Sequence, residues 1–251
     1  MVIFLLGFDN SKTAVIFKSM KKYKAVILAG GKGTRLYPIT YEIPKPLLPV
    51  KRRPILSHLV DLFVEQGIKD IAVLIHKEFR EEFEWWKKRY HPNQKILIQE
   101  EEKHLGTLGG LWNLKNWLSK GDFFISNGDE LKKIDLRKIA DFHQKRPVLV
   151  TVALVKVKNP QDYGVVVCKN GIVCKFIEKP KNPPSYYISS GLYMCSPEIF
   201  EYHPGPKFSM IETDLLPRLV KESKVGGIKF QGKWIDCGTF QRYEEALRKW
   251  K

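Results

Sequence analysis

Short apolar runs alternate with longer segments of helical periodicity through the first half of the chain. Continuous apolar runs bounded by polar residues are typical of strands that are buried on both faces. Such runs occupy residues 24–29, 70–75, 96–98 and 122–126. Between them, apolar residues recur every three or four positions, which predicts helices over residues 54–66, 77–90 and 107–118. Repeated strand–helix units of this length predict a doubly wound, mostly parallel, Rossmann-like α/β sheet.

The second half of the chain is richer in expected strands. The pattern predicts strands at residues 148–155, 163–168, 172–177, 186–194 and 225–230, and helices at 211–222 and 239–250. Lys169-Asn170-Gly171, between two of these strands, has the composition of a hairpin turn. No linker-like segment, internal repeat or hexapeptide pattern is present, so we expect one sheet shared by both halves and no C-terminal β-helix.

The charge of the chain is strongly positive. Its 43 Lys and Arg residues against 27 Asp and Glu give a formal net charge of +16. This surplus favours anionic partners and leaves nucleic acid, an anionic membrane surface and phosphorylated metabolites open. No apolar run approaches the roughly 20 residues of a membrane helix, so no membrane span is expected. The four cysteines lack zinc-type spacing, which favours buried, reduced thiols in a cytoplasmic protein.

The first residues of the chain precede the clear strand–helix pattern. A second methionine, Met20, stands just before the first strand. We therefore expect residues 1–22 to be an extension and residues 23–251 to form a single domain. For residues 1–19, a dispensable segment and an additional edge strand are both open. The apolar run at residues 2–8 is short and has no basic residue before it, so it does not fit a signal peptide.

A glycine-rich loop follows the first expected strand directly. Gly30, Gly31 and Gly33 allow the backbone to approach a polyphosphate closely and to direct N–H groups at it. Arg35 adds a forked cation that suits phosphate oxygens. The loop is not a Walker A motif, and Leu36 occupies the place of the third glycine in GxGxxG. The loop alone is also compatible with a tight turn that binds no ligand.

A lysine between two prolines follows nine residues after Arg35. In Pro44-Lys45-Pro46 the prolines fix the backbone on either side of Lys45 and so orient its ammonium group. Alone, this tripeptide is also compatible with an ordinary surface loop. The glycine loop and this lysine together indicate a phosphate site much more specifically.

These two segments resemble the signature of the sugar-1-phosphate nucleotidylyltransferases. The signature reads Gly30-Gly31-Lys32-Gly33-Thr34-Arg35-Leu36-Tyr37-Pro38-Ile39-Thr40, followed by Pro44-Lys45-Pro46-Leu47. Further matches follow in order: Leu105-Gly106-Thr107, Asn127-Gly128-Asp129, Tyr163-Gly164-Val165, Glu178-Lys179-Pro180, Ser190-Gly191-Leu192-Tyr193 and Trp234-Ile235-Asp236-Cys237-Gly238-Thr239. The resemblance runs from about Tyr23 to Trp250. Its motifs are most similar in style to the mannose-1-phosphate and heptose-1-phosphate guanylyltransferases.

The resemblance implies a transferase that joins a nucleoside triphosphate (NTP) to a sugar 1-phosphate and releases pyrophosphate. Residues 23–147 would form the NTP-binding half and residues 148–251 the half that binds the sugar phosphate. Asp129 and Asp236 would bind Mg²⁺, a hard cation that prefers carboxylate and phosphate oxygens. Sugar phosphate and NTP are thus the expected partners, with neither nucleic acid nor a membrane, and a homo-oligomer is compatible with the family.

The resemblance also implies roles for individual residues. Arg35 would hold the β- and γ-phosphates, Lys45 the α-phosphate, and Lys179 the phosphate of the sugar, and these three are the expected catalytic residues. The expected nucleotide site comprises Leu28, Ala29, Gly30, Gly31, Gly33, Thr34, Arg35, Glu101, Gly106 and Thr107. The expected sugar site comprises Asn127, Gly164, Glu178, Lys179, Ser189 and Ser190.

The segment before Gly106 should recognise the base. Glu101 aligns where uridylyl- and thymidylyltransferases of the family have glutamine, and a carboxylate only accepts hydrogen bonds. Guanine offers two adjacent donors, so Glu101 favours GTP. A shift of two residues would instead place Gln99 there and favour a pyrimidine. A solvated acidic loop is the third interpretation.

Two departures from the family pattern concern the sugar and the metal. Ser189 stands where asparagine is usual, and Glu130 replaces an apolar residue after Asp129. Glu101 and the style of the motifs favour guanylyl transfer to a mannose- or heptose-type sugar 1-phosphate. Uridylyl or thymidylyl transfer to glucose 1-phosphate and a non-catalytic regulator that binds nucleotide sugar are the alternatives.

Overall fold

The computed structural model of the protein describes residues 19–251. The two interpretations of the N-terminal segment concern residues that lie almost wholly outside this range. Met20 is within it and is buried against the first hydrophobic core. Within residues 19–251 no helix has the length and apolar character needed to cross a membrane.

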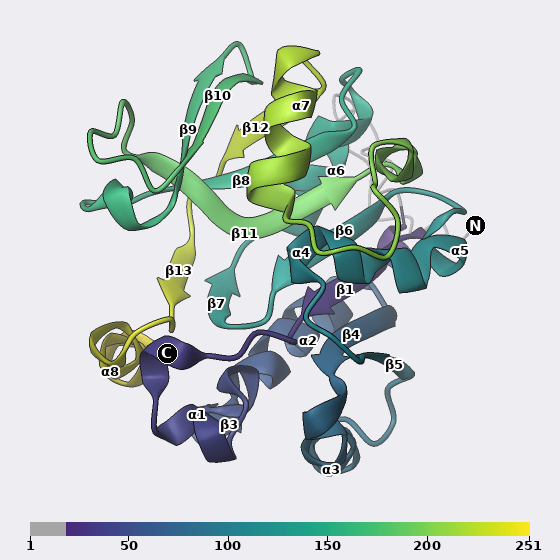
Figure 1. Ribbon diagram of the computed structural model, residues 1–251, viewed down its shortest axis with the longest axis vertical. Coiled ribbons are helices and arrows are strands. Elements are labelled where there is room, and N and C mark those ends of the chain that lie inside the picture. Colours follow the sequence, from purple (N-terminus) through teal and green to yellow (C-terminus); the bar gives the residue numbers. More distant parts are fainter. Residues whose placement is uncertain (1–18) are drawn as a thin grey trace, which may run out of the picture.

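The chain alternates strands and helices in the order shown in Figure 1. The strands are β1 (Lys24–Leu28), β2 (Pro49–Val50), β3 (Arg53–Pro54), β4 (Asp70–His76), β5 (Ile96–Glu101), β6 (Phe123–Asn127), β7 (Glu130–Lys133), β8 (Val150–Lys156), β9 (Gly164–Lys169), β10 (Ile172–Glu178), β11 (Tyr187–Cys195), β12 (Val225–Lys229) and β13 (Lys233–Asp236). The α-helices are α1 (Ile39–Glu42), α2 (Ile55–Glu65), α3 (Arg80–Tyr90), α4 (Gly106–Gly109), α5 (Lys115–Leu118), α6 (Leu136–Gln144), α7 (Leu216–Lys221) and α8 (Phe240–Lys249).

Both halves contribute to one nine-stranded sheet, as expected. Its strand order is β5-β4-β1-β6-β11-β8-β12-β10-β9. The strands β5, β4, β1 and β6 of the first half are all parallel, whereas β11 is antiparallel to both of its neighbours β6 and β8. The prediction of a mostly parallel sheet therefore holds for the first half only. The sheet as a whole is mixed, because hairpins such as β9–β10 build the second half.

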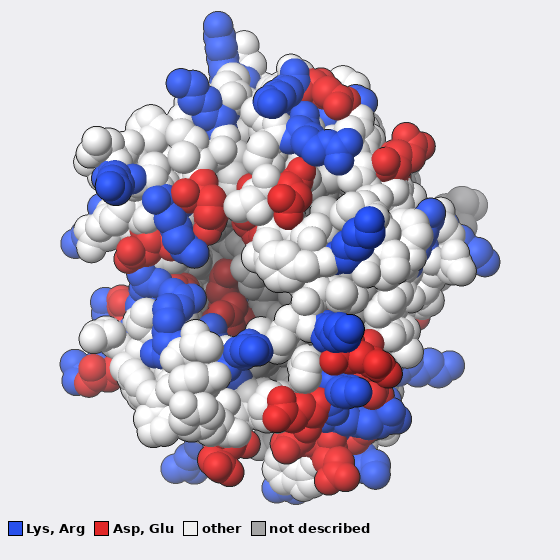
Figure 2. Space-filling model, in the orientation of Figure 1, with Lys and Arg blue, Asp and Glu red and all other residues white. Residues whose placement is uncertain are grey.

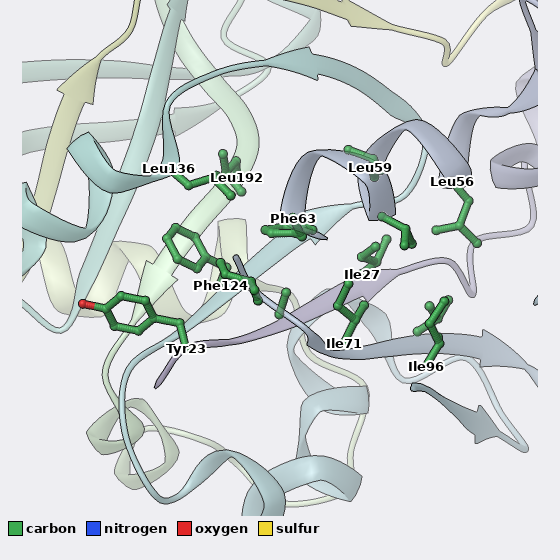
Figure 3. Close-up of a cluster of buried hydrophobic side chains, with 14 of the residues drawn as sticks. Tyr23, Ile27, Leu56, Leu59, Phe63, Ile71, Ile96, Phe124, Leu136 and Leu192 are labelled. Carbon is green, nitrogen blue, oxygen red and sulfur yellow. The ribbon is translucent and has the colours of Figure 1, made fainter. Parts of the chain in front are cut away.

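Helices cover both faces of the sheet, which gives the doubly wound architecture. Successive residues of β1 point to opposite faces: Ile27 packs into one core and Val26 into the other. The first core, shown in Figure 3, brings Phe63 of α2 against Ile27 and Phe124. The second core packs the segment from α4 to α5, together with α7, against the opposite face.

Two local predictions differ from the structure. The helix expected over residues 107–118 is interrupted, with a 3₁₀ segment (Gly110–Leu114) between α4 and α5. The sequence pattern also missed the antiparallel pair β7–β13, a separate two-stranded ribbon. This ribbon joins segments about a hundred positions apart, and each of its strands is only four residues long. It lies beside α8 in Figure 1 and fixes one edge of the site described below.

The four cysteines are free thiols. Cys195 and Cys237 are buried, as expected, but Cys174 is exposed and Cys168 is only partly covered. Cys174 lies on β10 at a register irregularity between Val173 and Lys175, where two consecutive residues are exposed, so burial of all four thiols was the wrong expectation.

Candidate active site

Two adjoining cavities lie at the carboxyl ends of the parallel strands. The first has a volume of about 300 Å³ and is lined by the glycine loop, Lys45 and Glu101. The second has a volume of about 410 Å³ and is lined mainly by charged and polar side chains of the second half. Four residues line both cavities: Thr107, Asn127, Asp129 and Met210. Figure 2 shows the resulting hollow, with carboxylates on its floor and Lys and Arg side chains at its edges.

The glycine loop begins where β1 ends. The last strand residue, Leu28, together with Ala29, Gly30 and Gly31, lines the first cavity. The backbone N–H of Ala29 donates to the carbonyl oxygen of Leu74 at 2.7 Å, so the loop leaves the sheet at a fixed angle. These four expected nucleotide-site residues therefore lie together in the first cavity.

The next residues of the loop face elsewhere. Gly33 has a φ of +67°, and Thr40 donates a hydrogen bond to its carbonyl oxygen at 2.9 Å. Gly33 and Thr34 line neither cavity. Arg35 lines the second cavity rather than the first, with its guanidinium against Gly238. The loop thus divides its residues between the two cavities, which spacing alone did not indicate.

Lys45 of the Pro44-Lys45-Pro46 segment contacts Asp129 of the Asn127-Gly128-Asp129 segment directly. Its ammonium nitrogen lies 2.6 Å from Oδ2 of Asp129, and only 9% of the residue is exposed. The flanking Pro44 and Pro46 are buried as well, so the lysine is held from both sides. Burial opposes ionisation of Asp129, but Lys45, together with Lys132 and Arg35, outweighs it and lowers the pKa of this carboxyl.

The ribbon β7–β13 brings the two predicted metal ligands together. Asp236 lies opposite Glu130 in the antiparallel register of the two strands. The backbone N–H of Cys237 donates to the carbonyl oxygen of Asp129 at 3.0 Å. Asp236 accepts hydrogen bonds from the backbone N–H of Gly238 and from Arg242, each at 2.7 Å. Burial and the nearby Asp129 raise the pKa of Asp236 despite Arg242. Two carboxylates that repel each other in this way would be stabilised by a cation between them.

The residues present fit a divalent metal that is shared with substrate. Within residues 19–251 no group of three or more His, Cys, Asp and Glu side chains is arranged to hold a metal ion. Asp129 and Asp236 would supply two hard oxygen ligands, and phosphate and water would supply the others. Magnesium sites commonly have this composition.

Glu130, the departure noted after Asp129, supports its neighbours. Its carboxylate accepts from Nδ2 of Asn127 at 3.0 Å and from Nε1 of Trp234 at 2.6 Å, and it pairs with Lys132 at 3.1 Å. Burial raises the pKa of Glu130 to about 7. A carboxylate in this place thus orients Asn127 at the junction of the two cavities.

Glu101 lies in the wall of the first cavity with a free carboxylate. It is only 6% exposed, and within residues 19–251 no group donates a hydrogen bond to its side-chain oxygens. Burial raises the pKa of Glu101 to about 7. A Cβ atom at Gly110 would lie 1.8 Å from one of these oxygens, so a glycine is needed to make room for the carboxylate.

The alternative residue for base recognition, Gln99, lies outside both cavities. Gln99 donates to the backbone carbonyl of Glu100, and Glu100 forms an ion pair with Arg80. The structure therefore supports Glu101 over Gln99, and the carboxylate lies inside a cavity rather than in a solvated loop.

The second cavity collects the expected sugar residues, with one exception. Gly164 is needed because a Cβ there would lie 2.5 Å from Phe176, and Lys179 pairs with Glu178 at 3.2 Å. The hydroxyl of Ser189 donates to the hydroxyl of Tyr193 at 3.0 Å, and both residues line the cavity. Ser190 was wrongly assigned to the sugar site.

The side chain of Ser190 points away from the cavity. It is fully buried, and its hydroxyl donates to the carbonyl oxygen of Ala153 at 2.8 Å. Successive residues of a strand face opposite sides, so Ser189 and Ser190 cannot both reach one cavity. Alternation along β11 would have identified the correct residue.

Three charged residues of the second cavity were not predicted: Asp162, Glu212 and Arg242. Glu212 accepts from Thr107 at 2.8 Å and from Tyr193 at 3.0 Å, and burial raises its pKa. Arg242 bridges Asp236 and Asp162, at 2.7 and 2.6 Å. None of the three lies within a recognised motif, although Asp162 directly precedes Tyr163-Gly164-Val165 and Arg242 follows Thr239 closely.

The comparisons with known proteins agree with this geometry. The sequence model of the nucleotidyl transferase family matches residues 24–251. The chain belongs to this family. Its members generally use a divalent metal ion. This nucleotidyl transferase is 33% identical over 225 residues to mannose-1-phosphate guanyltransferase 2 of Candida glabrata. The match covers 86% of the chain and 61% of that relative, so the chain spans about three-fifths of the length of the curated relatives it matches.

Solved structures of similar length share the fold. A proposed glucose-1-phosphate thymidylyltransferase from Bacillus anthracis superposes with a TM-score of 0.82 at 27% identity, over 90% of this chain and 94% of that chain. HddC from Yersinia pseudotuberculosis superposes with a TM-score of 0.79 at 28% identity, over 91% of this chain and all of that chain. HddC has also been solved in complex with GMP-PN.

Proposed function

We propose that this nucleotidyl transferase transfers a guanylyl group from GTP to a mannose- or heptose-type sugar 1-phosphate and releases pyrophosphate. The observation that carries the proposal is the junction of two cavities at Asp129, where Lys45 meets a predicted metal ligand at 2.6 Å. The first cavity would hold the NTP and the second the sugar phosphate. The α-phosphate would then lie where the cavities meet.

The chemistry at this junction is a direct displacement. A phosphate oxygen of the sugar 1-phosphate attacks the α-phosphorus of GTP, and the bond to the oxygen that bridges to the β-phosphorus breaks. Pyrophosphate takes the electron pair. A bound Mg²⁺ would supply charge neutralisation at the phosphates, held by Asp129 and Asp236.

The residues of the chain contribute position and charge. Lys45 is buried and oriented at the junction, so it can neutralise the negative charge that develops on the α-phosphate. Lys179 lines the second cavity and can hold the attacking phosphate in line. Arg35, which was expected at the β- and γ-phosphates, lines the second cavity as well, so to keep that role it would have to reach them across the junction. No side chain needs to form a covalent intermediate, because the substrate itself supplies the nucleophile.

GTP is favoured because the buried Glu101 carboxylate lies in the wall of the first cavity. Guanine presents N1–H and N2–H side by side, and a carboxylate can accept from both. The guanyltransferase name of the Candida relative and the GMP-PN complex of HddC support the same base. Likeness to the Bacillus structure keeps thymidylyl transfer as the alternative.

The decisive experiment is pyrophosphate release from a grid of GTP, UTP, dTTP, ATP and CTP with mannose, heptose and glucose 1-phosphates, in the presence of Mg²⁺. We expect turnover with GTP and a mannose or heptose 1-phosphate. Preference for UTP or dTTP would refute guanylyl transfer and retain the reaction class. Folded protein that releases no pyrophosphate with any pair would favour a non-catalytic regulator.

A further inference from the structure

A segment of the second half closes over the first cavity. Residues 205–211 follow the 3₁₀ turn (Pro197–Glu201) after β11 and lead into the π-helical turn (Ile211–Leu215) before α7. Ser209 fastens this segment to the turn at α4. The N–H of Ser209 donates to Leu105 at 2.9 Å, and its carbonyl oxygen accepts from Leu108 at 3.0 Å and Gly109 at 3.2 Å. Ile211 donates its N–H to the hydroxyl of Thr107 at 2.8 Å. These hydrogen bonds anchor the segment directly after residue 208.

The glycines of the α4 turn make this contact possible. A Cβ atom at Gly106 would lie 2.4 Å from the carbonyl oxygen of Ser209, and one at Gly109 would lie 2.2 Å from that of Lys207. Neither oxygen belongs to a flexible side-chain end, so any larger residue would displace the segment. The two glycines hold residues 207–209 against the first cavity.

Phe208 is the side chain that this anchoring places at the cavity. Its neighbour Ser209 is 3% exposed, yet Phe208 is 68% exposed and lines the first cavity together with Glu101 and His104. Among the large apolar residues described, it is the most exposed. The backbone is fixed directly after the ring, at Ser209 and Ile211, and before the ring Lys207 packs against Gly109, so the segment holds the ring at the cavity. Apolar surface that is held open at the mouth of a cavity is typical of a ligand contact.

We propose that Phe208 packs its ring against the base of the bound NTP and so acts as the closing wall of the first cavity. This inference rests on the proposed function, because it takes the first cavity as the NTP site. Every base has a π face, so this contact adds affinity without choosing among bases. Glu101 would choose the base, and Phe208 would hold whichever base has entered. The second half thereby contributes a nucleotide contact as well as the sugar cavity.

Binding of non-hydrolysable GTP and UTP analogues with Mg²⁺, measured by titration calorimetry, tests this role. We expect Phe208→Ala to weaken both analogues by about tenfold, the scale of one base–aromatic stack. The ratio of the two affinities should change by less than about threefold, because stacking tolerates any base. Phe208→Tyr keeps the ring and should bind like the unchanged protein.

Two controls separate stacking from a general loosening of the fold. Tyr186 is also a highly exposed aromatic residue, 60% exposed, and lines a separate surface pocket beside Pro183 and Pro184, so Tyr186→Ala should leave nucleotide affinity unchanged. Affinity for the sugar 1-phosphate should be the same in Phe208→Ala as in the unchanged protein.

Three results would overturn the inference. Unchanged analogue affinity in Phe208→Ala would show that the ring does not touch the nucleotide. An equal loss in Phe208→Tyr, or a parallel loss of sugar-phosphate affinity, would show a structural effect. If the unchanged protein binds no NTP analogue at all, the proposed function fails as well. If the unchanged protein binds the analogues and Phe208→Ala binds them equally well, only the role of Phe208 is refuted.

Discussion

The two cavities differ in how they are built, although they share a wall at Asp129. The first is lined largely by backbone and small or apolar residues, with Glu101 as its single buried free carboxylate. The second is lined by many ionised side chains, including Glu178, Lys179 and Arg242. A planar base needs close backbone approach and few polar contacts, whereas a hydroxylated, charged sugar phosphate needs many. The difference suggests that base and sugar are selected independently.

Loss of the shared wall should have the largest effect. Asp129→Asn removes the proposed metal ligand and the partner of Lys45, so kcat should fall by about 10³-fold. Both cavities keep their remaining contacts, so GTP-analogue affinity measured by calorimetry should fall much less than kcat. Asp70→Asn, at an exposed position that begins β4, is the matched control and should be fully active. Near-normal turnover of Asp129→Asn would remove Asp129 from the reaction.

Loss of a second-cavity cation should affect one substrate only. Lys179→Met should raise the KM for the sugar 1-phosphate by about tenfold, a modest effect because the side chain is 62% exposed. The KM for GTP should stay within about twofold, since Lys179 lines only the second cavity. Lys181→Met, two residues on and exposed, serves as control. A rise in the KM for GTP alone would reverse the assignment of the cavities.

Acidification should weaken GTP specifically. Burial raises the pKa of Glu101 to about 7, so the acid is protonated below that pH and cannot accept both guanine hydrogen bonds. GTP-analogue affinity should therefore fall by up to about tenfold from pH 8 to pH 6. The UTP analogue carries the same triphosphate, so its pH profile measures how protonation of the triphosphate alone changes affinity. Equal pH profiles for the two analogues would exclude Glu101 as the base contact.

The two neighbouring serines of β11 should separate binding from stability. Ser190→Ala should lower the free energy of unfolding by about 1 kcal/mol and leave the KM for sugar unchanged, because its hydroxyl bonds Ala153 in the core. Ser189→Ala should do the opposite and raise that KM by about threefold. Urea unfolding and steady-state kinetics of the pair measure both effects. A sugar defect in Ser190→Ala would restore its original assignment.

Seven of the ten residues expected in the nucleotide site line the first cavity, because they lie in short sequence segments. Gly33, Thr34 and Arg35 do not line it, and the distant Phe208 and Met210 were not predicted. Leu28 to Gly31 form one loop, and Glu101, Gly106 and Thr107 lie on one segment, so local motifs carry the information. The second cavity gathers residues from Arg35 to Arg242, and its closure depends on the short ribbon β7–β13. Pairing between distant four-residue strands leaves almost no periodic signal. The ribbon was therefore not predicted. Glu212 and Arg242 lie in no recognised motif and were missed, whereas the face of Ser190 could have been inferred from the alternation along β11.

Independent selection by the two cavities is tested most directly by Glu101→Gln, with Glu100→Gln as the neighbouring control. The measurement is kcat/KM for GTP and UTP, each with mannose 1-phosphate and glucose 1-phosphate. We predict that Glu101→Gln lowers the preference for GTP over UTP by about 10- to 100-fold, because a buried charged hydrogen bond is lost, while the sugar preference stays within about twofold. Glu100→Gln, whose side chain pairs with Arg80 outside both cavities, should change neither ratio. An unchanged GTP preference, or a sugar preference that shifts together with it, would contradict the account.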